Sequence, residues 1–410
     1  MAAATSDRGR ASTCRETRRA GNVAQESLRI GVVGAGISGL TFAAAMRRLS
    51  PATNVELYER DESATSRRQG YSLGLKGDAG LTVKTLDLYD LLAKEAITIT
   101  NFVICDQRGA RLLELPATGR VKRLTQRVRR QSLRHTLLGA ISDTPIHFGM
   151  AGTGYRQNSD AIEAQFMNRQ SVRTDYLIAC EGVASPIRQQ VIGDAKRYLG
   201  LTAIVGDAPI KIEHSLLEGG YFMSLGDDGS SVFCYRETDS IHLSYTVHVA
   251  EDALRTHTPA ALLRRLQQAT QAWHAPIPAV AIGIDPSTVV ARGYYDKEPT
   301  TRVRDGRVCL IGDAAHPMCP FQGQGANMAM VDGLKLAQLF ADLVARPAEA
   351  ELNAEALERD IVSRGRKAVL ASRRAAKQFH ATHRFSQRVR NAGFRFSNTV
   401  IKIVHNMSAV

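Results

Sequence analysis

The chain has 410 residues, of which 44% are hydrophobic and 23% are charged. These ordinary values exclude a chain that is disordered throughout and a small disulfide-stabilised scaffold. The net charge of +13 is uneven, because residues 115–142 carry seven Lys or Arg and no acid, and residues 361–410 carry eleven and no acid. The remainder is net acidic, so the total charge does not by itself indicate a nucleic-acid-binding protein.

The cysteines and the N-terminus bear on location. The six cysteines form no C-x-x-C pair, so they indicate neither a zinc site nor a disulfide framework, and free thiols fit a reducing cytosol. No stretch reaches the ~18 apolar residues of a membrane span, and the N-terminus lacks the apolar core of a secretory signal. We therefore expect a cytoplasmic protein without a metal site, in which residues 1–27 are a disordered basic extension.

Ordered structure is expected to begin at Leu28 with a β-α-β unit. Residues 28–33 form a short apolar run that fits a buried parallel strand, and the glycine-rich segment 34–39 follows it directly. Apolar residues then recur at helical spacing as far as Ser50, and a second strand, 55–58, ends at Glu59.

This unit carries the pattern Gly34-x-Gly36-x-x-Gly39 between strand and helix. Glycines there allow a tight turn, close approach of the backbone to a pyrophosphate, and close helix–strand packing. The helix N-terminus supplies amide donors for the diphosphate, and Glu59, 20 residues after Gly39, is placed to accept hydrogen bonds from the adenosine ribose. The spacing alone leaves FAD and NAD open.

The remaining elements follow from hydrophobic periodicity. Residues 61–80 are expected to form a loop, and residues 124–141 an amphipathic helix with a strongly basic face. Three runs of alternating polarity predict an antiparallel meander that could form the floor of a substrate lobe. These runs are 221–225, 231–235 and 241–247. The other predicted elements are strands within 161–180, a helix at 259–273, a strand at 307–311, and helices at 326–344 and 351–380 before a basic tail.

A second glycine-containing motif, from Gly312-Asp313 to Asn327, lies at a strand-to-helix junction nearly 300 residues after the first. Two distant phosphate-type loops fit one long dinucleotide, FAD, better than two nucleotides. Asp313 is placed to bind a ribityl hydroxyl, and Gly323 and Gly325 would let a flavin ring pack against bare backbone. Amides at the start of the next helix would stabilise negative charge on the reduced flavin.

The two motifs resemble those of the class A flavoprotein monooxygenases, the single-component FAD hydroxylases of the p-hydroxybenzoate hydroxylase fold, over about residues 28–385. The segment 58–61, reading Tyr-Glu-Arg-Asp, and the helix residues 368–377 are similar to the tetracycline-inactivating branch. The resemblance implies an α/β fold, with a Rossmann-like (GR2-type) FAD-binding domain, an inserted antiparallel-sheet substrate domain and a C-terminal helix.

The implied domain boundaries divide the chain into interleaved parts. Segments 28–75, 100–190 and 286–350 would form a discontinuous FAD-binding domain. Segments 76–99 and 191–285 would form the substrate-binding lobe, and 351–410 a C-terminal helical region.

The resemblance also implies a set of FAD-binding residues. These are Gly34, Ala35, Gly36, Ser38, Gly39, Glu59, Arg60, Arg130, Gly312, Asp313, Pro320, Gly323, Gly325, Ala326 and Asn327. Arg130, in the pattern Arg-x-x-Leu-Arg-x-x-Leu, would reach the cofactor; a solvated helix face is the alternative. A third family motif, which contacts the nicotinamide cofactor, is only partly kept in Glu181-Gly182 with Ser185 and Arg188, because Glu181 stands where the family has Asp.

The implied reaction uses non-covalent FAD, NADPH or NADH as a transient reductant, and O2. A flavin C4a-hydroperoxide would hydroxylate an aromatic, polyketide or similar small secondary-metabolite substrate. Water must be excluded from such a site. The candidate covering residues, each of which also suits ordinary sheet core, are Phe222, Phe233, Tyr235, Tyr245 and Phe321. No side chain is assigned as a catalytic acid or base, and His316 is interpreted as structural.

Two alternatives are kept from different classes. One is an FAD-dependent reductase or dehydrogenase that does not use O2. The other is a flavin-bound scaffold or sensor whose basic C-terminal tail binds a partner. A flavin halogenase is disfavoured, because that family carries a Trp-x-Trp-x-Ile-Pro stretch and Trp273 is the only tryptophan in this chain. We expect no nucleic-acid partner for the enzyme, and a monomer or a dimer.

Overall fold

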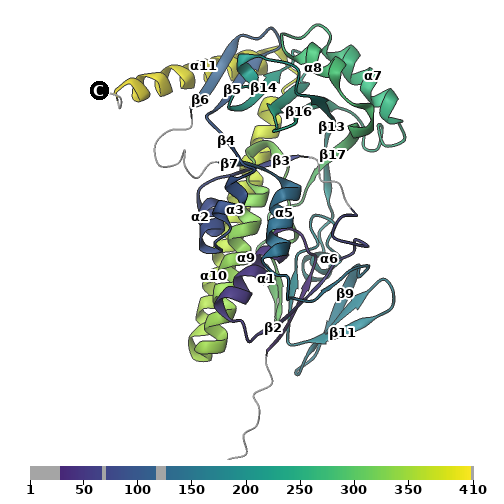
Figure 1. The fold of residues 1–410 in the computed structure, drawn as a ribbon, viewed down its shortest axis with the longest axis vertical. Helices are drawn as coiled ribbons and strands as arrows, with labels where there is room; N and C mark the ends of the chain where they lie inside the picture. The colour runs from purple at the N-terminus through teal and green to yellow at the C-terminus, as the bar shows by residue number, and fades with distance from the viewer. Residues whose placement is uncertain (1–27, 67–70, 117–125, 408–410) are drawn as a thin grey trace, which may run out of the picture.

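The computed structural model describes residues 28–66, 71–116 and 126–407, without the side chains of 347–351 and 404–407. The predicted extension at 1–27 lies outside this range. The described chain forms two lobes stacked along the long axis of the molecule (Figure 1). One lobe is built on a six-stranded sheet and the other on a seven-stranded sheet.

The first lobe confirms the predicted β-α-β unit. Its sheet is mostly parallel, with β1 between β2 and β12 and an antiparallel β18 at one edge. Its strands, in spatial order, are β18 (Arg304–Asp305), β19 (Val308–Leu310), β12 (Tyr176–Ala179), β1 (Arg29–Val33), β2 (Asn54–Tyr58) and β8 (Ile146–His147). The apolar side chains of β1, such as Ile30 and Val32, are fully buried, as expected for a strand covered on both faces.

Helices pack around this sheet. Helix α1 (Ile37–Leu49) lies directly against α9 (Gly325–Ala345), and this close approach requires glycine at position 333. A Cβ on Gly333 would lie 2.8 Å from the Ser38 carbonyl oxygen. The other helices of this lobe are α2 (Asp78–Thr85), α3 (Tyr89–Ala93), α5 (Arg130–Gly139) and α6 (Pro186–Ile192).

Two small antiparallel sheets complete the region around the first lobe. One consists of β11 (Ser171–Thr174), β10 (Ile162–Phe166) and β9 (Gly152–Gln157). The other consists of β3 (Ser72–Leu75), β7 (Gln126–Arg129) and β4 (Ile97–Thr98). The second of these lies between the two lobes (Figure 1).

The seven-stranded sheet forms the second lobe and contains the predicted meander. Its strands, in spatial order, are β17 (Val290–Asp296), β13 (Arg197–Pro209), β16 (Ser240–His248), β15 (Ser231–Arg236), β14 (Gly220–Leu225), β5 (Asn101–Asp106) and β6 (Arg111–Pro116). Helices α7 (Pro259–Thr270) and α8 (Ile277–Gly283) cover one of its faces. Three-residue 3-10 turns η1 (Ser215–Leu217) and η2 (Pro286–Thr288) lie at its margins.

Helix α10 (Pro347–Phe379) connects the two lobes. It runs along the long axis of the molecule (Figure 1), with Ile361 in the core of the first lobe and Phe379 in a cluster beneath the second sheet. Helix α11 (Arg384–Met407) then lies across β6. The predicted C-terminal helical region is therefore two helices with different contacts.

Three expectations differ from the structure. The expected helix at 124–141 is strand β7 followed by α5, because the Arg127 guanidinium is buried and donates to the Gly220 carbonyl oxygen (2.9 Å). The expected loop at 61–80 contains β3 and the start of α2.

The third difference concerns domain boundaries. Segments 101–116 and 290–296, predicted to lie in the FAD-binding domain, are strands of the seven-stranded sheet. Segment 76–99, predicted to lie in the substrate lobe, instead buries Ala79, Val83 and Leu92 in the first core. The pairing of β5 with β14 joins residues more than a hundred positions apart, and no local pattern records it.

Candidate cofactor and substrate site

The first motif folds as a tight turn between β1 and α1. Gly34 has φ +103°, and a Cβ there would lie 2.6 Å from the Cys180 carbonyl oxygen. A Cβ on Gly39 would lie 2.2 Å from the Gly34 carbonyl oxygen. At Gly36, by contrast, a Cβ would meet nothing within 4 Å. Gly34 and Gly39 are therefore required because neighbouring backbone atoms leave no room for a side chain, whereas Gly36 borders open space.

The open side of this turn suits a diphosphate. Gly36 caps α1 without a side-chain hydrogen bond, and the first turn of α1 holds no acidic residue. Its leading amides therefore face the space beside Gly36 with the partial positive charge of the helix N-terminus. A donor from another helix also lacks a partner, because the buried Nη2 of Arg134 has no hydrogen bond within the part of the chain that the structure describes. These features fit the diphosphate of FAD.

Glu59 is attached to the turn rather than extended into solvent. Its Oε2 accepts from the Ala35 amide (2.7 Å) and its Oε1 from the Asp61 amide (3.0 Å), and only 7% of the residue is exposed. Arg60 beside it is exposed. The carboxylate at the end of β2 thus lies at the turn, where the sequence predicts the ribose contact.

Of the two arginines in the Arg-x-x-Leu-Arg pattern, Arg134 is the one that touches the turn. Its Nε donates to the Ala35 carbonyl oxygen (3.3 Å), and its Nη1 donates to the Ala64 carbonyl oxygen. Arg130, predicted to reach the cofactor, donates to the Tyr71 hydroxyl (2.9 Å). Position 134 lies one helical turn after 130 on the same face, so the sequence pattern alone does not distinguish the two arginines.

The second motif meets the first in space. Gly312 has φ +60°, and a Cβ on it would lie 2.7 Å from the Ser38 Oγ. Turn η3 (Gly312–Ala314) therefore rests on α1, and Asp313 is exposed at the junction. Gly325, at the start of α9, lies close to Asp313, since its Cβ would be 3.6 Å from Asp313 Oδ1.

The end of the second motif presents open backbone. It comprises turn η4 (Pro320–Gln322), then Gly323 with φ +59° and nothing within 4 Å of a Cβ, then partly exposed Gly325 and Ala326. Helix α9 begins there without a side-chain cap, so its first amides lack a side-chain acceptor. This geometry fits a flavin ring lying against backbone.

The side chain of Asn327 links the backbone of two segments, and the cofactor contact of this residue stays a prediction. Its Oδ1 accepts from the Lys76 amide (3.0 Å), and its Nδ2 donates to the carbonyl oxygens of Gly74 (2.9 Å) and Gly323 (2.8 Å). The side chain is therefore occupied by backbone groups. It ties β3 to the start of α9 and holds the flavin-type loop in place.

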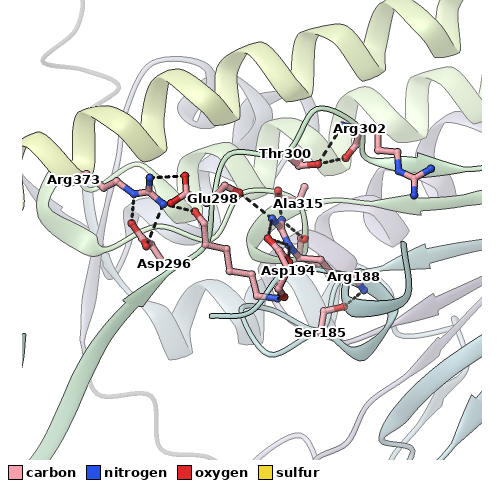
Figure 2. A network of polar contacts seen from close by, with 11 residues as sticks. Ser185, Arg188, Asp194, Asp296, Glu298, Thr300, Arg302, Ala315 and Arg373 are labelled. Carbon is pink, nitrogen blue, oxygen red and sulfur yellow. Dashed lines mark hydrogen bonds and ion pairs between the residues drawn. The ribbon is translucent and has the colours of Figure 1, made fainter. Parts of the chain in front are cut away.

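Arg188 of the third motif contacts the backbone of the second motif from the protein interior. The Arg188 side chain is fully buried, pairs with Asp194 (2.6 Å), and donates to the carbonyl oxygens of Ala314 (2.9 Å) and Ala315 (2.5 Å). Figure 2 shows this network continuing through Glu298 and Asp296 to Arg373 of α10. Arg188 therefore supports the second motif, because a guanidinium without exposed surface is not available to a transient reductant, and the nicotinamide contact of this motif stays a prediction.

Glu181 is the unusual member of this motif. Burial raises the pKa of its carboxyl group to about 7. Its Oε2 accepts from the Ser185 hydroxyl, while its buried Oε1 has no partner among the described residues. The Gly34 turn packs against the neighbouring peptide, so this carboxyl group lies directly behind the diphosphate-type loop.

His316 is structural, as interpreted from its position. Its Nε2 lies 2.5 Å from Asp332 Oδ2, and the same carboxylate accepts from the Gly312 amide (3.0 Å) and pairs with Arg364 (3.0 Å). This buried cluster fixes η3 to α9 and α10.

The predicted covering residues divide between the two faces of the seven-stranded sheet. Phe222 and Tyr245 lie in the core beneath α7 and α8, so their prediction as substrate contacts is wrong. Phe233 and Tyr235 point to the opposite face, because successive side chains alternate along a strand. There the Tyr235 hydroxyl accepts from the Ser72 amide (3.0 Å), next to β3.

Three further aromatic side chains complete this face. Tyr221 stacks on Phe233 with ring centroids 5.3 Å apart. Phe321, from η4, meets Tyr294 of β17 edge-on at 5.2 Å. The structure thus brings Phe233 and Tyr235 together with Tyr221 in one group of rings, and Phe321 together with Tyr294 in another.

Among the described residues, no helix is both long and apolar enough to cross a bilayer, and no group of His, Cys, Asp and Glu could hold a metal ion.

Comparison with known proteins identifies the family. The model of the family described as "FAD binding domain" matches residues 27–363. A 3-amino-4-hydroxybenzoate 2-monooxygenase of Streptomyces cremeus is 28% identical, covering 86% of this chain and 88% of that protein. An aurachin C monooxygenase/isomerase of Stigmatella aurantiaca is 26% identical, covering 76% and 80%.

Solved structures share the fold. Klebsiella pneumoniae HpxO complexed with FAD and uric acid superposes with a TM-score of 0.81 at 22% identity, covering 93% of this chain and 95% of that one. The tetracycline destructase Tet(51) superposes with a TM-score of 0.64 at 18% identity, covering 92% and 97%. The chain belongs to the FAD binding domain family and has the fold of the class A flavin monooxygenases.

Proposed function

We propose that this protein hydroxylates an aromatic or polyketide-like small molecule, using FAD, NAD(P)H and O2. The contact between the two motifs carries the proposal. Ser38 lies against Gly312, while Gly36 and Gly323 both border open space. One extended dinucleotide can occupy both loops, with its diphosphate at Gly36 and its ring at Gly323.

The residues that would hold FAD come from both motifs. The leading amides of α1 and the side chain of Arg134 would bind the diphosphate, and Glu59 the adenosine ribose. Asp313 would bind the ribityl chain, and the backbone from Gly323 to Ala326 would support the ring. Bound FAD would supply the redox chemistry, taking electrons from NAD(P)H and delivering them to O2.

The second sheet would exclude water and orient the substrate. The stacked rings of Tyr221 and Phe233, and the ring of Tyr294 beside Phe321, would offer an aromatic ring an apolar surface with hydroxyl groups. The activities of two relatives, on 3-amino-4-hydroxybenzoate and aurachin C, support a cyclic aromatic substrate. The reductant would dock transiently near the arginines of α5, whose charge favours its phosphates.

The test is NAD(P)H oxidation by the purified protein against a library of aromatic and polyketide compounds. We expect at least one compound to accelerate oxidation and to yield a product containing one additional oxygen atom. Product and H2O2 are measured separately, so coupled turnover is distinguished from wasted reduction of O2. Turnover that continues unchanged without O2 would instead identify a reductase or dehydrogenase.

A further inference from the structure

Helix α11 has one face buried and the opposite face open. Phe394 and Gln387 point inward, where the Gln387 amide donates to the Asp227 carbonyl oxygen (2.9 Å). Asn398 accepts from the Glu114 amide of β6 (3.0 Å). These contacts fix the rotation of the helix on the second lobe, so its outer face has a defined orientation.

The outer face carries a stripe of exposed apolar side chains. They are Phe385, Val389, Phe396, Val400 and Ile403, each between 42% and 78% exposed. Their spacing of three, four and seven places them within an arc of about 60° that extends about 27 Å along the helix. An apolar stripe of this length on an exposed helix marks an interaction surface.

A basic flank borders the apolar stripe. Arg384, Arg388, Arg395 and Lys402 are all exposed and lie on one side of it, and α11 contains no acidic residue. Among the described residues, none of these four side chains forms an ion pair with a carboxylate. The surface therefore combines apolar and cationic character with no charge compensation of its own.

We propose that α11 binds the surface of an anionic phospholipid bilayer. The apolar stripe would enter the boundary between headgroups and acyl chains while the basic flank contacts lipid phosphates, the arrangement of interfacial amphipathic helices. A second copy of the chain is disfavoured because pairing the stripes would bring two cationic flanks together. A nucleic acid would use the charge but leave the five apolar side chains exposed.

The place of the helix permits this contact. Figure 1 shows α11 at the end of the molecule formed by the second lobe, projecting beyond β6. The cofactor loops lie on other elements, and the stripe is on the opposite side of α11 from Phe394, whose cluster includes Phe233 and Phe321 of the proposed site. The test of this surface therefore does not depend on the proposed function.

The experiment is co-sedimentation of the full-length, FAD-loaded protein with vesicles of phosphatidylcholine alone or mixed with phosphatidylserine. We expect binding to the mixed vesicles, little binding to the neutral ones, and weakening by high salt. The double variant Phe385→Ser/Phe396→Ser should lower the partition coefficient at least tenfold. The variant Arg384→Gln/Arg388→Gln/Arg395→Gln should remove the preference for anionic lipid.

Matched controls come from the three-stranded sheet of β9, β10 and β11, at the first lobe. Met167→Ser changes an equally exposed apolar side chain at the β10–β11 turn, and Arg156→Gln/Arg169→Gln/Arg173→Gln removes three exposed charges there. Both should bind vesicles as the wild type does. Thermal unfolding and flavin content of every variant verify that it is folded.

Three outcomes would overturn the proposal. They are no binding to anionic vesicles at low salt, equal loss in the controls, or unchanged binding in the Phe385→Ser/Phe396→Ser variant. Sedimentation velocity identifies a second copy as the occupant if a concentration-dependent dimer disappears in that variant while vesicles are not bound. Retention on heparin without vesicle binding would identify a nucleic-acid-type polyanion instead.

Discussion

At the residue scale, Glu59 links the diphosphate turn to the end of β2. Both carboxylate oxygens already accept backbone amides, from Ala35 and Asp61, so the side chain is fixed before any ligand arrives. Replacing it removes both the predicted ribose contact and the support for the turn.

Glu59→Ala is therefore expected to weaken FAD binding at least tenfold, which corresponds to about 1.4 kcal/mol. The measurement is the FAD dissociation constant, from flavin fluorescence during titration of the apoprotein. Glu62→Ala, which removes an exposed acid from the following loop, is the control and should bind normally. Equal affinity of Glu59→Ala and wild type would show that the ribose is bound elsewhere.

Glu181 makes stability depend on pH. Because burial raises the pKa of its carboxyl group to about 7, the folded protein holds this proton more tightly than the unfolded chain does. Its contribution is complete below the ordinary pKa of a glutamate and is lost as the pH rises through about 7.

We expect the apoprotein variant Glu181→Gln to match the wild type at pH 5 and to be more stable at pH 8, by up to about 3 kcal/mol. Urea unfolding at the two pH values measures this difference. Parallel pH profiles for the two proteins would mean that the carboxyl group is ionised throughout. Glu181→Asp, which restores the family residue, tests the effect of side-chain length.

Much of this residue-level chemistry could be predicted from sequence. The turn glycines and Glu59 have a fixed spacing set by the β-α-β unit, so their positions follow from local pattern. Arg134 was missed in favour of Arg130, because both occupy one helix face and only the tertiary structure decides which one reaches Ala35. The contacts of Asn327 with Lys76 and Gly74 could not be predicted, because these two partners lie about 250 residues away in the sequence.

At the element scale, strands β14 to β16 contribute one face to the core of the second lobe and the other to the proposed substrate site. Phe222 belongs to the core beneath α7 and α8, whereas Phe233 belongs to the aromatic face. Alternation in the sequence identified the strands correctly. It could not say which face meets a helix, because both faces carry aromatic side chains.

The two phenylalanines form a matched pair. Phe222→Ala should lower the free energy of unfolding by about 3–5 kcal/mol, because it leaves a cavity in a closed core. Phe233→Ala should have a smaller effect on unfolding, but should increase the fraction of NAD(P)H oxidation that ends as H2O2, since it opens the site to water. Chemical denaturation measures the free energy of unfolding, and separate assays of the hydroxylated product and of H2O2 measure the coupling. This assignment would be contradicted if Phe222→Ala alone changed coupling.

Strand β7 illustrates a second limit of local pattern. The sequence around it suits an amphipathic helix, yet Arg127 is buried between Tyr221 and Tyr235, about 5.0 Å from each ring. The hydrogen-bond acceptors of Arg127 are carbonyl oxygens distant in the sequence. The local sequence therefore does not distinguish this buried arginine from one on the basic face of a helix.

At the scale of the whole molecule, buried ion pairs hold the lobes and the cofactor loop together. Arg188 joins α6 to η3, and Arg373 joins α10 to the end of β17 (Figure 2). The domain boundaries were difficult to predict because strands of the two lobes alternate along the chain and both lobes contact α10.

Arg188→Met should therefore lower the free energy of unfolding by about 3–5 kcal/mol, because it leaves the carbonyl oxygens of η3 and the Asp194 carboxylate without their main partner. Denaturant unfolding measures this loss. Arg255→Met, at a site where the side chain is 75% exposed, is the control and should change stability by no more than about 0.5 kcal/mol. A comparable small change in both variants would show that the network is not structurally important.

The most direct test of the account is the visible absorption spectrum of the purified protein, before and after denaturation. We predict a yellow protein with the absorption bands of a flavin, and FAD released into the supernatant on denaturation at about one equivalent per chain. A colourless protein that takes up no FAD when the cofactor is added would contradict the site built here from Gly36, Glu59 and Gly323.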